Sequence, residues 1–163
     1  MKLPVLLLLV AATTASAATR PVPSQCTAGV NSAYAAFVAA HAGGEAHQDN
    51  LMICGSSLGT AYTQRAGRSG NTHHVLIVSI PTANGSINVE VDTNDTLDGI
   101  VTASPGDPVY VYGQAYIDPG SHRRFGFTIT AGIHEPHCAT HAGADDGWIV
   151  IAGHKYPEHP CQS

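Results

Sequence analysis

The stretch that decides the fold class is HVLIVSIPTANGSINVEVD, residues 74–92. Its first half, His74–Ile80, is an apolar run of the length of a buried strand, and a proline follows it. In its second half, Ile87–Asp92, apolar residues alternate with polar ones, as on a strand with one buried face. Asn84-Gly85 lies between the two halves, so the stretch predicts a β-hairpin.

Further strands are predicted on both sides of the hairpin. Downstream, the turn signal Pro105-Gly106-Asp107-Pro108 precedes a strand over 109–117. Alternating apolar residues over 125–133 and an apolar segment at 148–152 predict two more, and a weaker strand is expected over 59–64 upstream. Five or six short strands separated by turns favour a mainly β fold, a small barrel or sandwich.

One α-helix is expected before the strands, over residues 28–42. Tyr34, Phe37, Val38 and His41 share one face of such a helix, Thr27 is a suitable cap, and two glycines follow. The predicted organisation is therefore an N-terminal segment with the helix at 18–54 and a barrel domain at 55–163.

Residues 1–17 have the pattern of a secretory signal peptide. Lys2 precedes an apolar run, and Ala15-Ser16-Ala17 matches a cleavage site. No apolar run is long enough to span a bilayer. The chain has 12 Asp and Glu against 7 Lys and Arg, a net charge of −5, so a strongly basic surface for nucleic acid is excluded. We expect a secreted or periplasmic protein without a membrane span.

The four cysteines predict two disulfides, because an even number in an exported chain indicates a disulfide framework. Of three possible pairings we favour Cys26–Cys54 and Cys138–Cys161, which each tie a terminal segment to the body of the domain. A Cys/His metal site is the alternative, although the spacing matches no zinc-finger pattern.

Tyrosines follow one face of the strand at 109–117. Tyr110, Tyr112 and Tyr116 lie opposite an apolar face. Aromatic stripes of this kind can bind sugars or bases, so we predict these tyrosines as ligand-binding residues. The alternative is that they pack against the helix or a neighbouring strand.

The order of elements resembles an oligonucleotide/oligosaccharide-binding (OB) barrel, chiefly in the segment GDPVYVYG at 106–113. The chain also resembles a family of small exported bacterial proteins of unknown function, through His134-x-Pro136, His141 and Asp146-Gly147-Trp148 near its C-terminus. The resemblance implies an OB-like barrel of five or six strands and an exported protein. It implies no particular activity.

The histidines near the C-terminus form the second candidate site. His134, His141 and Asp146, joined by His74 from another strand, have the donor types that bind a divalent metal such as zinc. The alternative is a loop scaffold in which imidazoles hydrogen-bond to carboxylates and carbonyls while Trp148 anchors the loop in the core. Catalytic residues remain unidentified, because no nucleophile elbow, Walker loop or His-Glu-x-x-His motif is present.

These patterns favour a binding module over an enzyme. The ligand is expected between the tyrosine strand and the loop at 134–148, and His134, His141 and Trp148 complete the predicted ligand-binding set. A sugar, peptide or protein partner is favoured over an oligonucleotide because the chain is acidic. A metal-dependent hydrolase or phosphodiesterase with a His/Asp site is the second hypothesis.

Overall fold

The computed structural model describes residues 20–65 and 70–161, so the predicted signal peptide lies outside the described residues. The described chain forms one helix and seven strands: α1 (Ser32–Ala40), β1 (Ala46–Arg65), β2 (Thr72–Thr82), β3 (Gly85–Asn94), β4 (Pro108–Arg124), β5 (Phe127–His134), β6 (Trp148–Ile151) and β7 (His154–Tyr156). The predicted mainly β fold with one N-terminal helix is confirmed. No helix in the described part of the chain is long and apolar enough to cross a bilayer.

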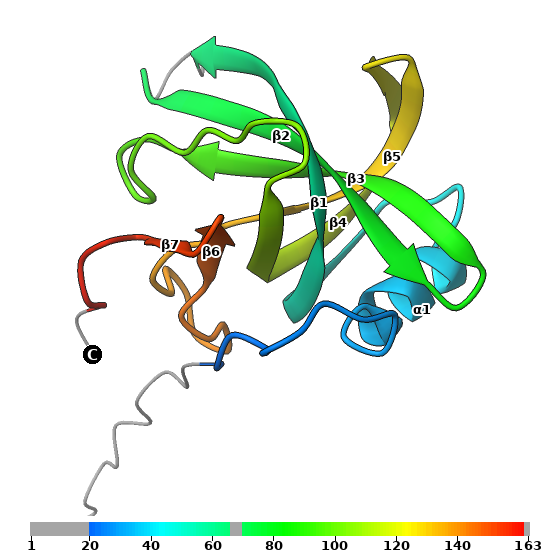
Figure 1. Ribbon diagram of the computed structural model, residues 1–163, viewed down its shortest axis with the longest axis horizontal. Coiled ribbons are helices and arrows are strands. Elements are labelled where there is room, and N and C mark those ends of the chain that lie inside the picture. The colour runs from blue at the N-terminus through cyan, green and yellow to red at the C-terminus, as the bar shows by residue number, and fades with distance from the viewer. Residues whose placement is uncertain (1–19, 66–69, 162–163) are drawn as a thin grey trace, which may run out of the picture.

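Five of the strands close a ring. They pair in the order β1-β2-β3-β5-β4, and β4 pairs in turn with β1. All these pairs are antiparallel except β3 with β5, where Glu90 lies opposite Gly132 and Val91 opposite Ile133. β6 and β7 extend the sheet from β4. In Figure 1 the ring is barrel-like, with α1 beside the β2–β3 hairpin and β6 and β7 on the other side.

The predicted hairpin is formed by β2 and β3. Thr82 pairs with Gly85, so the connecting residues are Ala83 and Asn84. Gly85 has φ of 118°, a backbone conformation that side chains disfavour, and it opens β3 rather than completing the turn. The Asn-Gly signal therefore identifies the hairpin correctly and misses the turn by one residue.

β1 joins both sides of the ring. Its first half pairs with β4 and its second half with β2. The sequence predicts only residues 59–64 as a strand here, because glycines and small polar residues interrupt the alternation. β1 instead starts at Ala46, within the predicted N-terminal segment, and register shifts at Ser57/Gly59 and Thr60/Tyr62 bend it between its two partners.

The main core fills the ring and includes one face of α1. Each ring strand contributes alternate apolar side chains, and those with no exposed surface include Ile53, Leu76, Val91, Val111 and Ile133, with Tyr34 from α1. Phe125 and Phe127, predicted to face inward with these, are 50% and 45% exposed. Phe125 lies in the turn before β5 at a φ of 48°, and Phe127 is the first residue of β5, so the buried alternation starts only at Ile129.

The two predicted disulfides are present, and the sulfur atoms of Cys26–Cys54 and Cys138–Cys161 lie 2.06 and 2.02 Å apart. The Cys/His metal alternative is therefore wrong for these cysteines, because a disulfide sulfur is not a thiolate. The bridges tie the N-terminal segment to β1 and the C-terminus to the loop after β5.

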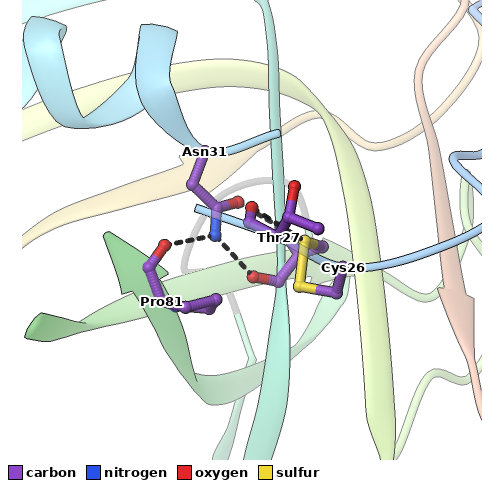
Figure 2. The surroundings of a disulfide bond; sticks show 5 residues. Cys26, Thr27, Asn31 and Pro81 are labelled. Carbon is purple, nitrogen blue, oxygen red and sulfur yellow. Dashed lines mark hydrogen bonds between the residues drawn. A yellow bond between two sulfur atoms is a disulfide. The ribbon is translucent and has the colours of Figure 1, made fainter. Parts of the chain in front are cut away.

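α1 is shorter than the predicted 28–42, and Asn31, not Thr27, precedes it. The Asn31 side chain makes no capping bond. It donates to the carbonyl oxygens of Cys54 (3.0 Å) and Pro81 (2.8 Å) and accepts from the Cys54 N–H (2.7 Å). Figure 2 shows this side chain between the disulfide and Pro81. Asn31 is fully buried, so these three bonds satisfy a polar group that would otherwise oppose folding.

Candidate functional site

A groove lies over β2, β3 and the loop that follows β5. It has a volume of about 460 Å³, and its walls include His73 and Val75 of β2, Asp92 of β3 and His134 at the end of β5. A side pocket of about 440 Å³ shares Tyr62, Asp92 and His134 with this groove. The two hollows share these three lining residues, and together they make up the candidate site.

Strand alternation puts the acidic residues of β3 at this surface. Val89 and Val91 enter the core, whereas Glu90 and Asp92 line the side pocket. Asp92 Oδ2 accepts a hydrogen bond from the Tyr116 hydroxyl at 2.8 Å. Burial, followed by the charge of Asp92, raises the pKa of Tyr116, so this phenol stays a protonated donor.

Gly132 on β5 allows that tyrosine to lie across the sheet. A Cβ added at Gly132 would come within 2.4 Å of the Tyr116 ring, a separation that side chains do not tolerate. The Tyr34 hydroxyl also donates to the Gly132 carbonyl at 3.1 Å. Gly132 is therefore needed here for space, and a side chain at this position would displace the ring from Asp92.

His134 is fixed by a chain of polar contacts. Its Nε2 lies 2.6 Å from Gln114 Oε1, and Gln114 Nε2 donates to Asp49 Oδ1 at 2.5 Å. Because a carboxylate only accepts, the Gln114 amide must point its nitrogen at Asp49 and its oxygen at His134. The proton of His134 is thus on Nε2, and Nδ1 keeps a lone pair.

Burial and the neighbouring charged groups favour the neutral form of His134. Burial lowers the pKa of His134, because the charged imidazolium loses hydration. Asp49 is the charged end: hydrogen bonding by Gln114 and then by His141 lowers its pKa. His141 lies 3.2 Å from Asp49 Oδ2 and is more exposed than His134. His134 therefore offers the groove an uncharged imidazole, which can act as an acceptor, a base or a metal ligand.

Three lining residues are buried and polar: Thr93, Asp98 and His137. Asp98 is 2% exposed; its Oδ2 accepts from the Asn94 N–H, and Oδ1 has no hydrogen-bond partner among the described residues. Burial raises the pKa of Asp98 to about 6. His137 is also buried, with Nδ1 2.9 Å from the Cys138 carbonyl. No sequence pattern identified Asp98, because it follows β3 in what resembles an ordinary turn.

The side pocket contains a second feature that the sequence did not indicate. The Arg124 guanidinium lies 4.4 Å from the centre of the Tyr62 ring, and its Nε is 3.5 Å from Glu90 Oε2. Glu90 is buried, so this ion pair offsets the loss of its hydration. Arg124 is thereby occupied within the fold and is not part of a free basic patch.

The four residues predicted as metal ligands have separate partners. His74 faces Asp95 (3.3 Å), His141 faces Asp49, and Asp146 Oδ1 accepts from the Ala139 N–H (3.0 Å). Only His134 of this set lines the groove. Within the described residues, one group has three potential ligand atoms within 4.8 Å of one another: Cys138, Asp146 and Cys161. Its sulfurs are bonded to each other, so it lacks thiolates to bind an ion.

The predicted ligand-binding aromatics divide into two groups. Tyr116 lines the side pocket. Tyr112 and Trp148 are buried with ring centroids 6.0 Å apart, and the Trp148 indole N–H donates to the Arg20 carbonyl at 2.7 Å. Tyr110 packs against the same small cluster. These three residues therefore have the packing role that was the alternative in the sequence, and they are not part of the candidate site.

Comparison with known proteins found no matching family model, no matching curated protein and no matching solved structure.

Proposed function

We propose that this protein is an exported binding module of the OB type, and that the groove over β2 and β3 is its ligand site. The ring order β1-β2-β3-β5-β4 with a parallel β3–β5 pair supports an OB-like barrel. OB barrels bind oligonucleotides and oligosaccharides over their second and third strands. The groove lies over the same two strands, with His73, Val75 and Asp92 in its walls.

The observation that carries the proposal is the polar lining of the groove. Asp98 and His137 are buried there, and Asp98 Oδ1 lacks a hydrogen-bond partner among the described residues. These buried polar side chains give the groove wall groups that can bind a ligand through hydrogen bonds and charge.

The charge of the residues that line the groove limits the classes of ligand that can bind there. Asp92, Asp98 and Glu135 are carboxylates, and none of the described residues that line the groove is a lysine or arginine. A nucleic acid would bring phosphates close to these carboxylates without basic groups to neutralise them. The groove therefore suits a sugar, a peptide or a protein segment better than an oligonucleotide.

Export is the second part of the proposal. Two disulfides persist in an oxidising compartment, which is the environment that the predicted signal peptide implies. These two features together support a secreted or periplasmic location. Cell fractionation of the producing cells should recover the protein outside the cytoplasm with both bridges formed.

The metal-dependent hydrolase is less well supported, because His74, His141 and Asp146 have partners of their own. The test is a measurement of metal content on untagged protein from residue 18 onward, together with NMR titrations of sugars and peptides. A binding module should carry far less than one equivalent of transition metal, and its ligand should shift amide signals of Val75, Leu97 and His134. Stoichiometric metal combined with hydrolysis of a phosphodiester would overturn the proposal.

A further inference from the structure

The turn between β4 and β5 exposes two phenylalanines. Phe125 and Phe127 are 50% and 45% exposed, whereas Phe37, the third phenylalanine of the chain, is buried. A Cβ added at Gly59 would lie 3.6 Å from the Phe125 ring and from Pro105, so the ring has neighbours on one side only in part, and half of the residue stays exposed. Two exposed phenylalanines at one turn need an explanation, whereas single exposed apolar residues need none.

Phe125 has a backbone conformation that suits other residues better. Arg124 pairs with Phe127, so Phe125 and Gly126 are the two residues of a tight hairpin turn, with φ of 48° and 82°. Asn-Gly and Gly-Gly usually form such turns, because a bulky side chain is strained at positive φ. The chain therefore has a large apolar residue where both strain and exposure oppose stability. Residues of this kind are often kept for function.

This turn is the outer end of an arm of the sheet. Beyond Ile117, β4 pairs among the described strands only with β5, because the pairing of β1 with β4 ends at Ala46. The turn lies at the edge of the barrel, at the upper right of Figure 1. The two phenylalanines can therefore reach a flat surface that the body of the barrel does not enter.

The charges around the turn favour an anionic surface. Residues 119–134 contain two of the seven Lys and Arg of the chain and none of its 12 Asp and Glu. Arg124 is paired with Glu90. Arg123 is exposed, and its Nη2 donates to the Gly126 carbonyl at 2.9 Å. A guanidinium has five N–H donors, so Arg123 keeps donors for a phosphate. The acidic residues further away are screened, since the Debye length is about 8 Å at physiological salt.

We propose that the β4–β5 turn binds the surface of a bilayer that contains anionic phospholipids. Phe125 and Phe127 enter the boundary between headgroups and acyl chains, and Arg123 hydrogen-bonds to lipid phosphates. An open hollow of about 480 Å³ beside the turn is lined by Tyr62, Arg123 and Phe125 among others, and it has room for a headgroup. Phe125, Phe127 and Arg123 are not among the described residues that line the groove of the proposed function, so this inference does not depend on it.

The interaction should be weak and reversible. Burial of each half-exposed phenylalanine should raise the partition coefficient of the protein onto vesicles about tenfold. One arginine close to an anionic surface should raise it about fivefold. These contributions are too few for stable anchoring, so binding should be partial and should fall as salt is added.

The test is flotation of the protein from residue 18 onward with lipid vesicles at pH 7.5 and low salt. We expect protein to float with vesicles made of equal parts of phosphatidylglycerol and phosphatidylcholine, and about fivefold less with phosphatidylcholine alone. In NMR spectra, a spin-labelled lipid should broaden the amide signals of Phe125, Gly126 and Phe127.

Phe125→Asn separates binding from stability. Asn suits the positive φ of this position, so the variant should melt at the temperature of the unaltered protein or higher. Its partition coefficient onto the anionic vesicles should nevertheless fall about tenfold. Phe127→Thr is a second variant, with a residue that suits a strand, and it should show a similar loss. Arg123→Gln should lose about fivefold.

Ile100→Asn is the matched control, because Ile100 is 68% exposed and apolar. It follows Gly99, where an added Cβ would lie 3.8 Å from the Tyr156 ring of β7, and β7 lies on the other side of the barrel from the turn (Figure 1). This variant should float as the unaltered protein does.

No flotation of the unaltered protein, or equal flotation of Phe125→Asn and Ile100→Asn, would overturn the inference. A third contrary result is a protein that does not float but whose turn amides shift with glycerol phosphate or a neutral oligosaccharide. That result would assign the turn to a soluble ligand instead of a bilayer.

Discussion

At the scale of single residues, Asp98 links the stability of the fold to the candidate site. Its carboxylate is buried, and its pKa is raised from 3.8 to about 6. A raised pKa means that the protonated form is favoured in the folded state. The contribution of Asp98 to stability is thus fully present below pH 4 and is lost as the pH rises through about 6.

Asp98→Asn should therefore stabilise the protein near neutral pH. A shift of about two units corresponds to roughly 3 kcal/mol at most, since one unit is about 1.4 kcal/mol. Urea unfolding at pH 7.5 should give a free energy of unfolding that is higher by about 1–3 kcal/mol, with little difference at pH 4. Asp107→Asn, a control whose carboxylate accepts from the Ser104 N–H in the turn before β4, should change it by less than about 0.5 kcal/mol at both values. Destabilisation by Asp98→Asn at pH 7.5 would show that the carboxylate has a partner that stabilises its charge.

Trp148 gives a second prediction at this scale. It is 1% exposed, packs on Tyr112 and donates to the Arg20 carbonyl. Trp148→Ala should lower the free energy of unfolding by about 3–5 kcal/mol, because it leaves a large cavity. Trp148→Phe keeps most of the packing and should lose less than half as much. A loss below about 1 kcal/mol in Trp148→Ala would contradict the packing role. It would favour the other hypothesis, that Trp148 is a ligand-binding residue on the surface.

At the scale of elements, α1 is attached to the barrel by one buried side chain and one disulfide. Asn31 bonds to the backbone of Cys54 on β1 and of Pro81 on β2, and Cys26–Cys54 covalently ties the segment before α1 to β1. The sequence predicted the bridge from cysteine number. It did not predict the role of Asn31, because a polar residue before a helix usually indicates a cap.

Asn31→Ala should lower the free energy of unfolding by about 2–4 kcal/mol, since it leaves the Cys54 and Pro81 backbone groups buried without partners. The matched control is Ser32→Ala, one residue further on. Ser32 is exposed and bonds only to the nearby Gly29 carbonyl, so this change should be within about 0.5 kcal/mol. Similar losses for the two variants in chemical denaturation would mean that Asn31 is an ordinary helix-flanking residue.

The hairpin and β1 show which elements were predictable. β2 and β3 are adjacent in the chain and joined by a turn with its own residue signal, so the sequence identified both. β1 changes partners from β4 to β2 along its length and bends at Gly59, so neither of its halves has a regular period. Residue alternation along the sequence predicts such a strand poorly, because the two strands that it pairs with lie far away in the sequence.

At the scale of the whole molecule, the candidate site results from closure of the ring. Asp49 of β1, Gln114 of β4, His134 of β5 and His141 beyond it are brought into one chain of contacts by three strands that are distant in sequence. The sequence identified His134 from residue type alone. Spacing along the chain carried no information on Asp49, Tyr62 or Asp98, whose roles depend on burial and on contacts across the barrel.

The central claim is that His134 and His137, which line the groove, each have one ring nitrogen fixed as a hydrogen-bond donor within the fold. Long-range ¹H–¹⁵N correlation spectra of the histidine rings test it most directly, because they identify the protonated nitrogen of each ring. At pH 7.5 we predict the proton of His134 on Nε2 and that of His137 on Nδ1, and His134 should titrate below its usual value of 6.5. Rings that exchange freely between both tautomers at pH 7.5, together with a His134 pKa of 6.5 or higher, would contradict the claim.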